Sequence, residues 1–331
     1  MARLRKLRPS TAALALMPSF ILVFIFVYVF ISYTIRISLS KNWMPGLQNF
    51  AVAKPWYKNY YNLASSSRFQ TDIRNTIIFT LFFLIISVTV GLLLAIAVSN
   101  MYRSKVFFRN LFIMPYAVSF IVTGVVWRWI FNPVAGVNLL FKYSGFDSLY
   151  KHTYGTTLQL QWMTSPTVVG NVTKLLNHVL PGSGFITVQM GIPIALLPVI
   201  FAAAWQLCGF AMAMFLAGLA SIPQELREAA AIDRATGFRY YRSIALPSLM
   251  PMAITTLVIL TSTSLKIFDL IYSMSGSGIG FATDMPGIFV YEEMYKALNY
   301  PLGTAASVFM LIAVCLIVLP YLIRFNKGHE E

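Results

Sequence analysis

The chain has 331 residues, of which 58% are hydrophobic and only 11% are charged. Soluble domains carry about 25% charged and about 45–50% apolar residues, so this composition excludes an ordinary soluble domain and requires surface that faces lipid. The net charge of +14 would suit nucleic acid, but the cations lie between long apolar runs, which favours membrane topology instead.

Six apolar runs are long enough to cross a bilayer, which takes about 20 residues. They lie near residues 12–34, 76–99, 110–131, 194–220, 247–268 and 303–323. Backbone in lipid must satisfy its own hydrogen bonds, so we predict an all-α integral membrane protein with six transmembrane helices. The first run could be a signal peptide, but it exceeds the usual apolar region of about 7–15 residues and lacks a small-residue cleavage site. We therefore expect it to be retained.

Lys and Arg are densest in four segments, 1–11, 100–109, 221–246 and 324–331. The positive-inside rule makes these segments cytoplasmic, so we expect both termini inside a multi-pass protein of the cell (inner) membrane. The expected plan is a basic N-terminus at 1–11, a first transmembrane helix at 12–34, an extracytoplasmic loop at 35–75, a five-helix core at 76–324 and a cytoplasmic tail at 325–331. The core is expected to contain an extracytoplasmic loop at 132–193 and a cytoplasmic loop at 221–246.

The residue types that build catalytic and metal sites are scattered along the chain. Cys208 and Cys315 lie inside apolar runs, where a free cysteine is usually a small core residue, and the three histidines show no metal-ligand spacing. The sequence contains no Walker lysine motif, no HExxH and no GxSxG. We expect no catalytic residue, no metal site and no cofactor in this chain.

The most informative segment is the cytoplasmic loop that precedes the fifth span. Ser221 and Gln224 have the spacing of a capping box, and Pro223 suits a first helical turn. The alanines at 229–231 form a small-residue patch that would let a partner approach closely, and Gly237 is expected to break the helix. A second short basic helix should then lead back into the membrane. The pattern alone leaves open an ordinary solvated amphipathic loop.

This loop resembles the EAA loop of ABC importer permeases. Glu228-Ala229-Ala230 is followed by Ile244 and Leu246-Pro247 at the family's offsets, whereas Arg234 occupies the position of the family's glycine, and a glycine follows at 237. The resemblance implies that the loop couples the spans to an ATPase. The implied coupling residues are Glu228, Ala229, Ala230, Asp233, Gly237, Ile244, Leu246 and Pro247.

The resemblance extends over about two-thirds of the chain, to the permeases of carbohydrate importers of the maltose and glycerol-phosphate type. The segments 75–100, 107–133 and 265–286 carry it, whereas 134 to about 190 matches poorly. It implies the type I permease fold of ABC importers. It also implies a second permease subunit, for which we favour a heterodimer, two cytoplasmic ABC ATPase subunits that bind ATP-Mg, and an extracytoplasmic solute-binding protein.

A sugar that crosses lipid must exchange its hydrogen bonds with water for bonds to protein, so the spans need polar and aromatic groups. Such groups occur near Tyr116, near Trp205 and at 261–264. In the permeases that this chain resembles, the corresponding segments contact the solute, and the resemblance implies contacts at Tyr116, Ser119, Phe120, Gln206, Leu207, Ser264 and Ile267. Phe120 falls where the relative has a hydroxyl, so we expect a different sugar specificity. These groups could instead bond to neighbouring helices.

Three other classes of membrane protein fit the sequence less well. An ion-coupled secondary transporter usually needs ionisable groups inside its spans, but here only Arg128, Lys266 and Asp269 lie at span ends, which leaves a sodium-coupled or facilitative carrier as the alternative. An intramembrane enzyme needs a catalytic pair or a metal set at depth, which the spans lack. A scaffold is disfavoured only by the resemblance. If the chain serves an ATP-driven importer, the ATPase must be another polypeptide.

Overall fold

The structure is a computed structural model that describes residues 9–145, 161–170 and 188–327. The predictions for the first eight residues, for much of the loop 132–193 and for the last four residues concern parts outside this range. The chain divides into two units, which we describe separately. Unit 1 comprises Met1–Ala64 and Val290–Leu311, and unit 2 comprises Ser65–Phe289 and Ile312–Glu331.

Unit 1 is built on an uninterrupted helical run and the segment that follows it. The run consists of α1 (Pro9–Val23), the π-helical η1 (Phe24–Val29) and α2 (Phe30–Ser38). The unit also contains α3 (Lys58–Ser65), η5 (Glu292–Lys296) and the first turns of α17 (Tyr300–Lys327). Its aromatic centre is Trp43, whose ring lies 5.9 Å from Tyr33, 6.3 Å from Phe50 and 5.4 Å from Tyr300. The end of α2 and the start of α17 are therefore joined through one side chain.

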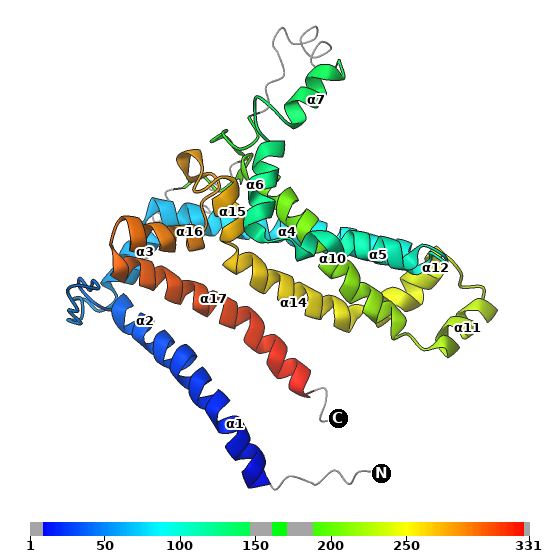
Figure 1. The fold of residues 1–331 in the computed structure, drawn as a ribbon, viewed down its shortest axis with the longest axis horizontal. Helices are drawn as coiled ribbons and strands as arrows, with labels where there is room; N and C mark the ends of the chain where they lie inside the picture. Colours follow the sequence, from blue (N-terminus) through cyan, green and yellow to red (C-terminus); the bar gives the residue numbers. More distant parts are fainter. Residues whose placement is uncertain (1–8, 146–160, 171–187, 328–331) are drawn as a thin grey trace, which may run out of the picture. The chain divides into compact units, whose positions relative to one another are not determined.

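The core of unit 2 is the packing of α10 (Leu196–Ala220) along α4 (Ser67–Ser99), with α14 (Met250–Lys266) also against α4 (Figure 1). The Ser66 hydroxyl caps α4 by accepting a hydrogen bond from the Phe69 amide at 3.5 Å. Gly91 permits the close approach, because a Cβ there would meet Ala211 of α10. Large side chains such as Phe79, Phe83 and Phe215 fill the interface.

Two of the predicted spans are broken rather than continuous. The span near 110–131 consists of α5 (Lys105–Ile113), the 3-10 turn η2 (Met114–Ala117) and α6 (Phe120–Ile130), with a bend of 95°. The second break, of 65°, lies between Phe238–Ser248 and α14. Each break has prolines beside it, at Pro115 in the first case and at Pro247 and Pro251 in the second, and proline removes a helical donor.

Shorter elements complete the described chain. Three of them precede the cytoplasmic loop at 221–246, namely α7 (Val137–Tyr143), β1 (Val168–Val169) and β2 (Ile192–Pro193). The two strands pair antiparallel, with Val168 opposite Pro193. The loop itself contains α11 (Gln224–Ile232), α12 (Phe238–Tyr240), η3 (Tyr241–Ala245) and α13 (Leu246–Ser248). After α14 follow α15 (Asp269–Met274), which packs against α6, then η4 (Ile279–Phe281) and α16 (Pro286–Tyr291).

Among the described residues, four helices are long and apolar enough to cross a membrane, and the total reaches six if each bent pair is one span. The four are Leu16–Ser38, Ser67–Ser99, Leu196–Ala220 and Tyr300–Ile323. The structure thus contains an apolar helical segment at each of the six predicted positions. The cytoplasmic loop at 221–246 lies between the fourth and the fifth of these segments.

Candidate functional site

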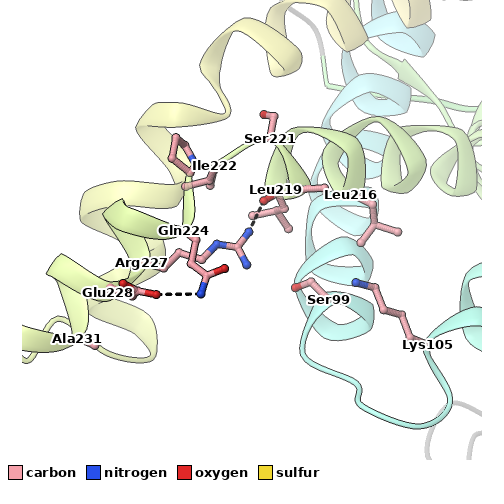
Figure 2. Close-up of a pocket in the computed structure, with 12 residues that line it drawn as sticks. Ser99, Lys105, Leu216, Leu219, Ser221, Ile222, Gln224, Arg227, Glu228 and Ala231 are labelled. Carbon is pink, nitrogen blue, oxygen red and sulfur yellow. Dashed lines mark hydrogen bonds between the residues drawn. The ribbon is translucent and has the colours of Figure 1, made fainter.

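The EAA loop, defined here as residues 221–246, is attached directly to the end of α10. Helix α11 begins at Gln224, after Pro223, and the Ser221 hydroxyl donates back to the Gly218 carbonyl at 2.8 Å. The predicted capping box is therefore wrong, because its serine bonds to the preceding helix instead. Arg227 supplies the link between the helices, donating from Nη2 to the Leu219 carbonyl at 2.5 Å (Figure 2). A cation at a helix C-terminus also suits the helix dipole.

This link fixes which face of α11 points outward. Ala230 is only 3% exposed and packs within this chain, whereas its neighbours Ala229 and Ala231 are exposed. Glu228 is exposed and accepts a hydrogen bond from the Gln224 amide at 2.8 Å (Figure 2). Because Ala230 is buried, only Ala229 and Ala231 of the expected small-residue patch are at the surface. Ala229 is therefore the motif alanine that a partner could reach.

The turn after α11 shows how the chain accommodates Arg234 at the position of the family's glycine. Arg234 has φ +53°, the Ala235 amide bonds to the Ala230 carbonyl at 2.8 Å, and the Arg234 amide bonds to the Ala231 carbonyl at 3.2 Å. These two bonds form a Schellman motif with Arg234 at the left-handed position that glycine usually occupies. Arginine thus keeps the turn geometry despite the departure from the family pattern, at a cost of about 1–2 kcal/mol for the left-handed backbone.

Gly237 has a different conformation, with φ +56° and ψ −129°, a region open essentially to glycine alone. A Cβ there would meet no atom of the described residues within 4 Å, so the penalty for a side chain comes from the backbone conformation. Gly237→Ala is expected to destabilise the loop by about 1–3 kcal/mol, whereas Arg234→Gly should be neutral or stabilising. Hydrogen exchange at the Ala235 amide measures both effects. Equal protection in the two variants would contradict this account of the turn.

The second half of the EAA loop returns to the membrane through Ile244 and Leu246-Pro247. Ala245 is buried, whereas Leu246 and Pro247 are exposed. Tyr241 donates its hydroxyl to the Asn100 side chain at 2.9 Å, which ties this half to the end of α4. With the Arg227 link, the loop is anchored to two core helices, so a force on the loop would be transmitted to both.

A cavity of about 800 Å³ opens beneath α11 and beside the ends of α4 and α10 (Figure 2). Lys105 of α5, Arg227 and Glu228 of α11, and Ser99 of α4 contribute its polar lining. Four large apolar side chains of the loop remain at the surface, with Ile232 83% exposed, Phe238 79% exposed, Leu226 47% exposed and Leu246 39% exposed. Such a group on a charged loop is typical of an interaction surface. The sequence motif identified neither these residues nor Arg227.

The first candidate solute segment lies at the break between η2 and α6. Tyr116 is 48% exposed and packs its ring 5.4 Å from that of Phe210. Ser119 is exposed at the start of α6, and Phe120 is half-buried. These three residues are brought together by the extended backbone at Val118 and Ser119, whose ψ angles are 140° and 141°.

The other four candidates are enclosed in this structure. Gln206 is 1% exposed and donates to the Val118 carbonyl at 2.6 Å, so it satisfies a backbone group freed by the break. Its Oε1 is buried and has no hydrogen-bond partner within the described part of the chain. The Ser264 hydroxyl lies 2.9 Å from that of Thr80, and Leu207 and Ile267 are buried. A solute could reach these four only after the helices move.

Spans broken at prolines, together with a two-part loop that carries the EAA motif, define a membrane permease of the importer type. The chain belongs to the family described as the binding-protein-dependent transport system inner membrane component, which matches residues 87–325. This membership confirms the resemblance, the fold class, the inner-membrane location and the permease role. It also confirms that the chain is a transport subunit rather than an enzyme.

Named relatives cover most of the chain. It is 32% identical over 321 residues to a probable ABC transporter permease protein of Pyrococcus horikoshii, covering 96% of both chains. It is 30% identical to the sn-glycerol-3-phosphate transport system permease protein UgpA of Agrobacterium fabrum, covering 83% of this chain and 78% of the relative. The trehalose/maltose transport system permease protein MalF of Thermococcus litoralis is 26% identical, with coverage of 93% and 91%.

The fold also matches a solved structure. A chain of a bacterial ABC transporter that imports the acidic polysaccharide alginate superposes with a TM-score of 0.72 at 19% identity, covering 96% of this chain and 95% of that one. The same kind of transporter in complex with alginate-pentasaccharide-bound periplasmic protein gives 0.69 at 19% identity, with coverage of 94% and 92%. At this identity the likeness concerns the fold.

Proposed function

We propose that this chain forms part of the translocation path of an ATP-driven importer for a sugar or sugar-like solute. The relatives named for trehalose/maltose and sn-glycerol-3-phosphate transport support this substrate class. A binding protein would deliver the solute from outside, in keeping with the binding-protein-dependent family. No acidic residue lies inside the six predicted spans, and Arg128 and Lys266 lie near span ends, which argues against an ion-coupled carrier.

The observation that carries the coupling part of this proposal is the anchored loop with an exposed apolar face. In our proposal, two cytoplasmic ABC ATPase subunits bind ATP-Mg and receive Leu226, Ala229 and Ile232 in a cleft. ATPase closure then pulls on α11, and the Arg227–Leu219 and Tyr241–Asn100 bonds pass the motion to α10 and α4. A second permease subunit completes the path, and both termini of this chain lie in the cytoplasm.

For the solute we propose a site that starts at the Tyr116–Ser119 break and extends toward α10 when the helices rearrange. Three buried polar atoms of α6 and α10 support this placement, because Thr123 Oγ1, Trp127 Nε1 and Gln206 Oε1 have no hydrogen-bond partner among the residues that the structure describes. Buried unpaired polar groups cost about 1–3 kcal/mol each. A sugar hydroxyl that bonded to such a group would recover that cost. The exposed Tyr116 ring offers a face on which a sugar could stack.

Tyr116→Ala is therefore expected to raise the KM of solute uptake about tenfold, a loss typical of one good contact, with normal expression and complex assembly. Tyr143→Ala is the matched control, since Tyr143 is 83% exposed on α7, away from the break. Gln206→Ala should act differently and lower the yield of folded protein, because the Val118 carbonyl would be left unpaired. Wild-type uptake kinetics in both Tyr116→Ala and Gln206→Ala would move the site elsewhere.

A further inference from the structure

A separate cavity of about 620 Å³ lies within unit 1, far along the chain from the EAA loop. Its polar lining is formed by Lys41, Lys54 and Lys58 together with Asn59, Asn62 and Asn299. None of the described residues that line it is acidic. Residues 1–71 contain no acidic residue, and the two glutamates of unit 1 before Asn299, Glu292 and Glu293, are not among the residues that line the cavity.

Backbone bonds hold the three lysines in place. The Lys41 amide donates to the Ala51 carbonyl at 2.8 Å, and the Ala53 amide donates to the Leu39 carbonyl at 2.9 Å, so the segment before Lys54 folds back onto the end of α2. Asn59 is buried beside Lys58 and donates to the carbonyls of Ser38 and Ser40, both at 2.8 Å. The backbone around the cavity is therefore held by hydrogen bonds, and three lysines line the cavity that it forms.

The chain path places this cavity at a membrane surface. Lys41 closely follows the span that ends at Ser38, and Asn299 directly precedes the span that begins at Tyr300. The contact of Trp43 with Tyr300 keeps those two span ends on the same side. Beside the cavity residues, Trp56 is 63% exposed and stacks edge-to-face on Tyr57 at 5.7 Å. Exposed Trp and Tyr of this kind are enriched at the headgroup level of membranes.

We propose that this cavity binds the phosphate group of an anionic phospholipid. Ammonium groups attract a phosphate, and the exposed Asn299 amide can donate hydrogen bonds to its oxygens, whereas Asn59 already uses its two donors on backbone carbonyls. The volume lies within the range of about 300–1,000 Å³ that small-ligand sites occupy. A choline headgroup would bring a cation against three lysines, so the cavity should select lipids of net negative charge. The same cations would also attract a soluble phosphate ester, and the experiment must separate the two sources.

The test uses the purified full chain in nanodiscs that contain equal amounts of phosphatidylglycerol and phosphatidylcholine. Native mass spectrometry then counts the lipids retained after release. The wild type is expected to retain phosphatidylglycerol about tenfold over phosphatidylcholine, as three nearby lysines would favour an anionic headgroup. The variant Lys41→Gln/Lys54→Gln/Lys58→Gln should lose this preference.

The control removes three cations elsewhere, as Arg128→Gln/Lys142→Gln/Lys266→Gln, all exposed and outside the cavity. It should retain the preference, and an equal loss in the control would show a general charge effect and overturn the proposal. Lys54→Glu alone should also remove the preference, which guards against misfolding of the triple variant. Retention unchanged in both cavity variants would refute the site. A bound inorganic phosphate adduct without lipid selectivity would assign the cavity to soluble anions and contradict the lipid assignment.

Discussion

Ala229→Trp is expected to reduce ATP-driven uptake to background, with the chain itself still folded and inserted. Ala229 is the exposed alanine of the EAA motif, on the outward face of α11, next to the exposed Ile232. Overpacking a tight contact costs about 1–3 kcal/mol, which corresponds to roughly a fivefold to hundredfold weaker ATPase association. Co-purification of the ATPase and uptake in proteoliposomes measure the effect.

Two neighbouring substitutions make this test specific. Ala229→Ser adds one hydroxyl on an exposed position and should retain both assembly and uptake. Ala230→Trp should instead disrupt the loop from within, because Ala230 is buried against this chain, and it should therefore lower the protection of the α11 amides from hydrogen exchange. Normal ATPase binding and uptake in Ala229→Trp would show that the outward face of α11 is not a docking surface.

Asp284→Ala is expected to cause the largest loss of stability among single substitutions in unit 2. The Asp284 side chain is fully buried and accepts a hydrogen bond from Arg68 Nε at 2.6 Å. The Arg68 guanidinium also lies 4.7 Å above the Phe281 ring. Asp284→Ala removes the carboxylate that Arg68 contacts at 2.6 Å, and loss of one partner of a buried pair typically costs about 3–5 kcal/mol.

Asn75 joins the same network and gives an independent check. Its amide donates to the carbonyls of Phe281 and Asp284, at 3.0 and 2.9 Å, so Asn75→Leu would remove a hydrogen bond from each, including the buried one to Asp284. Lys296→Gln is the matched surface control, since its pair with Glu292 is an exposed i,i+4 bridge worth about 0.3–0.5 kcal/mol. The fraction of monodisperse protein after heating in detergent should fall sharply for Asp284→Ala and Asn75→Leu only. Equal behaviour of Asp284→Ala and Lys296→Gln would contradict the proposed role of this network.

The sequence predicted the positions of the helices well, because long uncharged runs have few alternatives to membrane-spanning helices. It could not predict that the third span breaks by 95°. Pro115 indicates a kink, but a full break also depends on a group that satisfies the freed backbone. That group is the side-chain amide of Gln206, which donates to the Val118 carbonyl from 88 residues away along the chain. Such long-range compensation carries no local sequence signal.

The EAA motif predicted the loop but not its orientation. The spacing Glu228-Ala229-Ala230 does not say which alanine faces outward, since that depends on the rotation of α11 set by Arg227 and the Leu219 carbonyl. Because Arg234 replaces the family's glycine, the sequence did not define the conformation of this turn, which the positive φ angle of Arg234 now does. The solute residues show the same limit. Resemblance placed Ser264 and Gln206 on the path, whereas in this conformation both are buried by neighbouring helices.

The most direct test of the central claim is uptake of labelled maltose, trehalose and glycerol phosphate into proteoliposomes. The vesicles should contain this chain with its co-purifying permease and ATPase subunits, and the binding protein is added outside. We predict that uptake of at least one solute requires both ATP and the binding protein, and that it persists when ionophores collapse all ion gradients. Uptake that is sustained by an ion gradient with ATP depleted and the binding protein omitted would contradict the account and identify the chain as a secondary transporter.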